Sequence, residues 1–113
     1  MTAVYLILGL PGAGRHELVT NLVEDGLQEP QSVTVFHAAD DLGPPNPDKH
    51  ITFVPYVFEG GSFVIEPKDE PAEEPKEAFF IADGGKSVID QLEAFPAWLR
   101  VRGWELARIL LVV

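Results

Sequence analysis

The amino-acid sequence predicts one α/β domain in three layers, with a mainly parallel β-sheet and a single β-hairpin. Short, continuous apolar runs alternate with a segment of helical period, a pattern typical of parallel strands covered by helices on both faces. A Gly-Gly pair between two further runs indicates the hairpin. With 113 residues, of which 46% are hydrophobic, the chain has the size and composition of a single folded domain, residues 1–113.

The chain opens with a strand, a glycine-rich loop and a helix. Residues 4–8 are the first apolar run, and turn residues follow it directly from Gly9. Over residues 15–25 the apolar side chains recur at helical spacing, and Gly26 is placed where a helix C-terminal cap belongs. The loop is therefore expected to join the end of a buried strand to the start of a helix.

Further strands are expected along the rest of the chain, at residues 32–36, 51–58, 62–65, 78–82 and 106–113. The pair Gly60-Gly61 separates the second and third of these and predicts a hairpin. Residues 109–113 are expected to form a fully buried central strand. Because nothing follows to cover that strand, we expect the chain to be the front part of a longer domain or a reduced version of one.

A helix is predicted over residues 87–101, since Ser87 and Asp90 have the spacing of a capping box. Pro96 is expected to kink this helix or to start a second turn. The two tryptophans near its end are expected to pack it onto the sheet; they are Trp98 and Trp104.

The charge of the chain limits its partners. With 18 acidic and 8 basic residues the net charge is −10, which argues against nucleic acid, because affinity for phosphates comes from lysine and arginine. Seven acids gather between Glu59 and Glu77, and the proline-rich part at 67–77 is expected to be a solvated loop. The alternative is that its carboxylates bind a metal ion or a partner.

Other features of the sequence indicate a cytoplasmic protein. No apolar run approaches the ~20 residues of a membrane-spanning helix, so no membrane partner is expected. The N-terminus has no basic leader before its apolar run, and the absence of cysteine excludes disulfides and thiolate metal sites.

The glycine-rich loop resembles a phosphate-binding loop. Residues 9–16, Gly-Leu-Pro-Gly-Ala-Gly-Arg-His, match the pattern G-x-x-x-x-G-K-[ST] in both glycines. Glycines let successive backbone N–H groups point at phosphate oxygens, and the following helix adds the positive end of its dipole. The residues expected to bind phosphate are Gly9, Pro11, Gly12, Ala13, Gly14, Arg15 and His16.

Two positions of the loop depart from the pattern. Arg15 replaces the lysine that reaches the outer phosphates, and His16 replaces the hydroxyl residue that binds Mg²⁺. Both changes affect γ-phosphate chemistry, whereas the glycine backbone is intact. The loop is therefore expected to bind an anion with slow hydrolysis or none, and no catalytic residue is assigned. The alternative is that the glycines only form a tight strand-to-helix turn.

Acids that directly follow strands are the candidate metal ligands. Asp83, after the strand at 78–82, is the better candidate for Mg²⁺, and Asp40 is a second one. Turn formation is the alternative for each. The three histidines, at positions 16, 37 and 50, are scattered, so a joint metal site with Asp83 is a minor hypothesis.

Three blocks, residues 4–23, 78–92 and 107–113, resemble the GTPase domain of CobW-type metallochaperones, a group of P-loop NTPases. The resemblance implies that the loop glycines and Arg15 line the phosphates and that Gly85 replaces the glycine that senses the γ-phosphate. In the family, an acid stands at the end of the strand that corresponds to residues 78–82. Ala82 occupies that position in this chain, and Asp83 is one residue later. The cysteine metal motif of the family is absent, and so is its guanine-reading motif within the 113 residues.

Two functions follow from these features. The first is a nucleotide-binding domain that takes GTP or ATP with Mg²⁺, a weak nucleoside triphosphatase at most. The second is a non-catalytic interaction module, derived from such a domain, that binds a partner protein through the acidic loop or the edge of the last strand.

Overall fold

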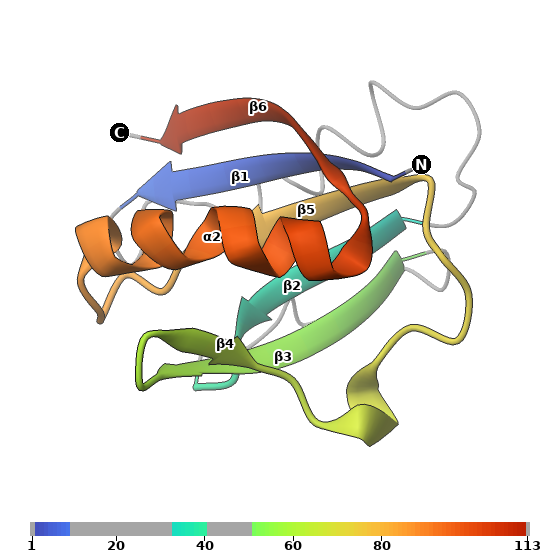
Figure 1. Ribbon diagram of the computed structural model, residues 1–113, viewed down its shortest axis with the longest axis horizontal. Helices are drawn as coiled ribbons and strands as arrows, with labels where there is room; N and C mark the ends of the chain where they lie inside the picture. The colour runs from blue at the N-terminus through green and yellow to red at the C-terminus, as the bar shows by residue number, and fades with distance from the viewer. Residues whose placement is uncertain (1, 10–32, 41–50, 113) are drawn as a thin grey trace.

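A six-stranded β-sheet runs through the computed structural model, which describes residues 2–9, 33–40 and 51–112 (Figure 1). The strands lie in the order β4-β3-β2-β5-β1-β6. Their bounds are β1 Ala3–Gly9, β2 Val33–Ala38, β3 Ile51–Glu59, β4 Ser62–Val64, β5 Glu77–Ile81 and β6 Glu105–Val112. A 3-10 turn, η1 (Pro67–Asp69), and the α-helix α2 (Val88–Arg102) complete the described elements.

The predicted α/β class, the mainly parallel sheet and the hairpin are confirmed. All described strand pairs are parallel except β3 with β4, which is antiparallel. The helix predicted over residues 15–25, with the loop before it, lies outside the described residues, so the third layer stays a prediction.

The apolar runs form strands because the sheet buries them on both faces. β2 is buried along its whole length, as expected for an interior strand of a parallel sheet. On one face, Val4 and Leu6 of β1 belong to a cluster that also contains Phe95 and Trp98 of α2. The opposite face has its own apolar cluster, made of Ile7, Val33, Val35, Ile51, Phe79 and Ile81.

The helix α2 has the ends that its sequence predicts. The backbone N–H of Asp90 donates to Ser87 Oγ at 3.3 Å, and Gly103 ends the helix with φ 71°. The helix is continuous through Pro96, so of the two alternatives, a kink or a second turn that starts there, the second does not occur. Both Pro96 and Leu92 are exposed, so water can bind the Leu92 carbonyl, which lacks its usual N–H donor in the helix.

The last strand is not the buried central strand that its sequence predicts. β6 stands at the end of the strand order and pairs with β1 alone among the described strands. Ile109 is 53% exposed and Leu111 71% exposed. The prediction was wrong because α2 packs over β1, β5 and β2, which leaves the outer strand uncovered by any described element (Figure 1).

The hairpin turn depends on two glycines. Gly60 (φ 60°) and Gly61 (φ 74°) both have left-handed backbones, and Glu59 pairs with Ser62 across them. A two-residue turn with two positive φ angles matches the twist of the strands that it joins.

Replacement of Gly60 by valine is expected to lower the free energy of unfolding by about 1–2 kcal/mol, the cost of a Cβ in the left-handed region. A Cβ at this position would meet no atom within 4 Å, so the loss reports backbone strain alone. Urea denaturation measures it. Gly60→Asn is the control and should lose less, because asparagine tolerates this conformation; equal losses would contradict the explanation.

Candidate functional site

The connections that follow the neighbouring strands β1 and β5 run in opposite directions along the sheet. From β1 the chain continues to β2, beyond β5, whereas from β5 it crosses through α2 to β6, beyond β1 (Figure 1). Since β1 and β5 are parallel neighbours, both connections leave from the same edge of the sheet. This is a topological switch point, the place where open α/β sheets bind their ligands.

Two predicted site positions lie at this edge of the sheet. Ile7 pairs with Ile81, and the N–H of Ala82 donates to the Ile7 carbonyl at 3.0 Å. Two residues beyond this pair, Gly9 ends β1 and Asp83 follows β5. Both residues therefore lie at the carboxyl ends of neighbouring parallel strands, at the same edge of the sheet.

Asp83 is buried, and its carboxylate takes part in the turn that follows β5. Asp83 Oδ1 accepts a hydrogen bond from the N–H of Gly85 at 2.9 Å. A Cβ on Gly85 would lie 3.3 Å from this oxygen, so glycine permits the close approach. The turn role proposed as the alternative for Asp83 is thus observed, and it occupies one carboxylate oxygen.

A buried glutamine, which the sequence analysis missed, holds this turn in place. Gln91 of α2 accepts from the Asp83 N–H at 2.7 Å and donates to the Asp83 carbonyl at 2.8 Å. It also donates to the Ser87 carbonyl at 3.2 Å. Gln91 starts the core-facing stripe of α2 that continues at Phe95 and Trp98. A polar residue on an otherwise apolar stripe is the sequence feature that could have identified it.

The carbonyl at the end of β5 has a partner from a distant strand. Tyr56 of β3 is 1% exposed and donates its hydroxyl to the Ile81 carbonyl at 2.6 Å. The carboxyl end of β5 is thus held from β3 as well as from α2, which makes the start of the Asp83 turn rigid.

Of the remaining acid and histidine candidates, the structure describes Asp40 and His37. Asp40 follows β2 and is exposed, and His37 is buried with Nδ1 2.9 Å from the Ala38 carbonyl. Among residues 2–9, 33–40 and 51–112, no three His, Cys, Asp or Glu residues are grouped as they would be around a metal ion. His16 and His50 lie outside these residues, so the histidine hypothesis stays untested.

Of the predicted phosphate ligands, the structure describes Gly9 and Gly85. The others lie outside the described residues; they are Pro11, Gly12, Ala13, Gly14, Arg15 and His16.

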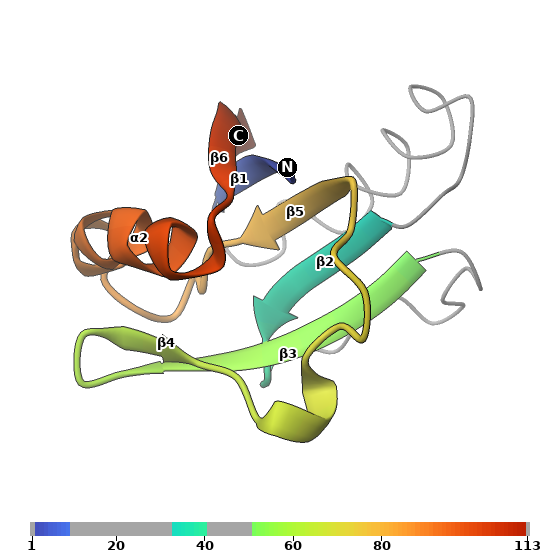
Figure 2. The same ribbon diagram turned by 45° about the vertical axis from the view of Figure 1, so that its right-hand side comes forward.

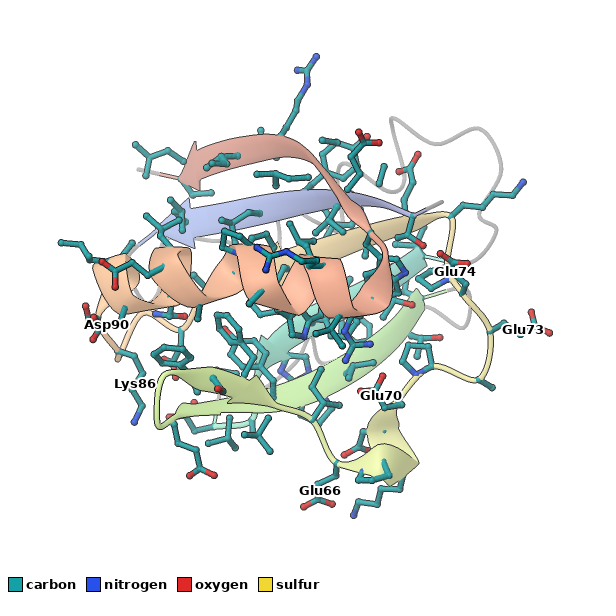
Figure 3. The ribbon with its side chains drawn as sticks, viewed as in Figure 1. Glu66, Glu70, Glu73, Glu74, Lys86 and Asp90 are labelled. Carbon is teal, nitrogen blue, oxygen red and sulfur yellow. The ribbon has the colours of Figure 1, made fainter. Side chains whose placement is uncertain are left out.

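One residue of the acidic loop forms an ion pair with the helix α2. Glu70 binds Arg102 through two hydrogen bonds of 2.7 and 2.8 Å. The Arg102 guanidinium lies 4.6 Å from the ring centre of Trp98 and 5.3 Å from that of Trp104. Both tryptophans contact the core, as predicted. Glu66, Glu73 and Glu74 are exposed, in agreement with the predicted solvated loop (Figure 3).

No protein-family model, curated protein or solved structure matches this chain. Within the described residues, no helix combines the length and apolar character required to span a bilayer.

Replacement of Gln91 by methionine keeps the side-chain volume and removes both hydrogen-bonding groups. We expect the free energy of unfolding to fall by about 1–3 kcal/mol, since a buried N–H and C=O of Asp83 lose their partner. Hydrogen exchange at the Asp83 amide should accelerate. Glu93→Met, at an exposed position of the same helix, is the control and should stay within about 0.5 kcal/mol. An unchanged exchange rate at Asp83 would contradict the role assigned to Gln91.

The hydrogen bonds from Arg102 lower the pKa of Glu70, and the positive charge of Arg102 adds to this, against the opposing effect of burial. A carboxyl group whose folded-state pKa is lowered stabilises the fold above its unfolded pKa of about 4.3 and loses this effect as the pH falls through the folded-state pKa. Glu70→Gln should therefore reduce stability at neutral pH, by at most about 1 kcal/mol because the pair is partly exposed. The difference should vanish in acid.

Urea unfolding at a series of pH values measures this difference. Glu73→Gln removes one negative charge from the same loop without breaking an ion pair that the structure describes, so it is the matched control. A Glu70→Gln deficit that persists unchanged in acid would show that the ion pair is not its cause.

Proposed function

We propose that this chain binds a nucleoside triphosphate or diphosphate at the carboxyl ends of β1 and β5, as a domain similar in fold and loop to P-loop NTPases. The observation that supports the proposal is that Gly9 and Asp83 stand at the carboxyl ends of the neighbouring strands β1 and β5, where the connections of the sheet run in opposite directions. The glycine-rich sequence that begins at Gly9 supports it, because such a loop offers backbone N–H groups to phosphate oxygens.

Each part of the site has a distinct task in this proposal. The backbone of residues 9–14 binds the phosphates and Arg15 supplies a positive charge that compensates them. The resemblance to CobW-type GTPases favours GTP over ATP and places Gly85 near the outer phosphate.

The carboxylate of Asp83 fits a Mg²⁺ site in part. One of its oxygens is committed to Gly85, and no hydrogen bond joins the other to the described residues. That oxygen would hold Mg²⁺, directly or through water, and the ion would neutralise phosphate charge. Because position 82 is alanine and position 16 is histidine, the site offers fewer metal ligands than an efficient nucleoside triphosphatase. We therefore propose binding with slow hydrolysis or none.

Thermal unfolding with ATP, GTP and their diphosphates, each with and without Mg²⁺, tests this proposal. A ligand at about 100 times its dissociation constant should add ~2.7 kcal/mol of stability. Arg15→Ala should weaken binding about tenfold or more, which corresponds to ~1.4 kcal/mol. Arg108→Ala, on the exposed strand β6, is the matched control. The absence of a shift with every nucleotide would refute the proposal.

Asp83→Asn separates the metal role from the turn role. Asparagine keeps an oxygen for the Gly85 N–H, so stability without ligand should change little. The part of the nucleotide-induced shift that depends on Mg²⁺ should decrease. If that part is unchanged, Asp83 does not hold the metal.

A specific observation favours a second function, an interaction module. β6 is an edge strand with exposed apolar side chains, and it lacks proline and inward charges in its last four residues, 109–112. Edges of this kind pair with other strands unless they are protected. Under this second proposal, β6 pairs with the same strand of another copy.

Sedimentation at increasing protein concentration tests the pairing, and a mass that rises with concentration is expected. Leu111→Lys should abolish the rise, because lysine is a side chain that protects natural edge strands. Val101→Lys, at a position of α2 that is 88% exposed, makes the same charge change away from β6 and should not. A monomer mass at all concentrations would exclude pairing.

A further inference from the structure

Exposed apolar side chains gather along β6 and the side of α2 that is turned toward it. Figure 2 shows α2 with β4 on one side and with β1 and β6 on the other. Ala94 and Val101 line the hollow between α2 and the hairpin, so they mark the β4 side of the helix. Because a helix turns about 100° per residue, Ile89 and Leu92 lie on the other side of Phe95, toward β6. Ile89 is 68% exposed and Leu92 is 37% exposed.

The two most exposed side chains of the end of β6 lie on the same face of the sheet as α2. Ile109 pairs with Leu6 and Leu111 pairs with Leu8, and both leucines of β1 belong to the cluster that contains the core residues of α2. Leu110 lies on the opposite face, against the second apolar cluster. Ile109 and Leu111 therefore extend the exposed apolar side of α2 onto the edge strand.

The charge of the chain is distributed so that this edge is neutral. β6 contains one acid, Glu105, and one base, Arg108. Glu59 and Glu66 stand before and after β4, which is at the opposite end of the strand order, and Figure 3 shows Glu66 and Glu70 on the side of the sheet away from β6. A second copy that approaches β6 therefore meets no excess of like charge on this strand, although each chain carries a charge of −10.

The regular part of β6 is short. Its register with β1 shifts at Ala107, because Val4 pairs with Leu106 whereas Tyr5 pairs with Arg108. An extra residue of this kind disrupts the hydrogen-bond ladder locally. The segment that offers a regular edge to another strand is therefore 108–112.

Within this segment, one antiparallel register with a second copy matches the faces of the two strands. Residues that lie opposite each other in an antiparallel pair share a face. If the pair is centred on Leu110, Ile109 lies opposite the second copy's Leu111 on the α2 side, and Leu110 lies opposite its own copy on the other side. Arg108 lies opposite Val112, which the apolar stem of the arginine covers.

We propose that the β6 dimer is centred on Leu110 and that its interface includes Ile89 and Leu92 of α2. The inference rests on the pairing of β6 proposed above, and it adds the register and the contribution of the helix. Ile109 and Leu111 of both copies form one apolar strip across the joined sheet, and the two helices border the strip with Ile89 and Leu92. Main-chain hydrogen bonds join the edges, and the strip supplies the apolar contact.

Single cysteines test the register, because the chain has no cysteine of its own. Leu110→Cys is expected to give a disulfide-linked dimer on mild oxidation, since opposite residues have Cβ atoms about 4.5–5.5 Å apart. Ile109→Cys and Leu111→Cys, mixed in equal amounts, should link to each other more than either links to itself. Glu105→Cys, outside the regular segment, is the control and should stay largely unlinked on denaturing gels.

Sedimentation over a series of protein concentrations tests the contribution of the helix. Ile89→Ser should raise the dissociation constant of the dimer about fivefold or more, because an apolar contact is lost in each copy. Val101→Ser makes the same kind of change on the β4 side of the same helix, at a position that is 88% exposed, and should leave the constant unchanged. Circular dichroism verifies that each variant folds.

The outcomes separate this inference from the pairing on which it rests. A monomer mass at all concentrations would overturn both and leave the apolar surface to a different partner. A dimer that Leu111→Lys dissociates, but that Leu110→Cys does not link, would retain the pairing and overturn the register. A dimer that Ile89→Ser does not weaken would overturn the contribution of α2.

Discussion

The aromatic packing around Phe80 is the interaction on which the rest of this structure depends. Phe80 is fully buried in β5, and its ring centre lies 4.7–5.9 Å from five other aromatic rings. These rings come from β2, β3, β4 and α2, and belong to Phe36, Tyr56, Phe63, Phe95 and Trp98. One side chain thus joins the strands to the helix. Offset and edge-on ring pairs contribute about 0.5–1.5 kcal/mol each beyond the area that they bury.

The geometry at the switch point is a consequence of this packing. Phe95 fixes the position of α2 on the sheet, and Gln91 lies one helical turn before it, so the same contact brings the Gln91 amide to the backbone of Asp83. Tyr56 stacks on Phe80 and, from that position, reaches the Ile81 carbonyl. The turn after β5 is therefore held by residues that the apolar core positions, in addition to its own hydrogen bond between Gly85 and Asp83.

Local patterns in the sequence predicted the elements but not their neighbours. The strands lie within one or two residues of their predicted bounds, because apolar runs and the pair Gly60-Gly61 report backbone preferences directly. The last strand was misplaced because an apolar run has the same composition at the centre of a sheet and at its edge. Only the strand order, which depends on long-range pairing, separates the two.

The same distinction applies to the candidate site. The positions of Gly9 and Asp83 at one edge of the sheet were predictable because each stands at the end of an apolar run and parallel strands end at one edge. The role of Gln91 was not predictable. Its partner, the backbone of Asp83, is eight residues away in a turn whose shape no spacing rule specifies. The ion pair between Glu70 and Arg102 was not predictable either, because the two residues are 32 positions apart and the acids next to Glu70 are exposed. Arg15 and His16 lie outside the described residues, so the loop chemistry is still a prediction.

The position of β1 in the sheet also constrains how the chain can fold. Ala3 pairs with Glu77 on one side and with Glu105 on the other, so both neighbours of β1 come from residue 77 onward. Contacts between residues so distant in sequence slow folding, because a long loop must close before they form. During synthesis β2, β3 and β4 can therefore pair early, whereas the apolar residues of β1 remain without their native neighbours until residues 77–112 have been made.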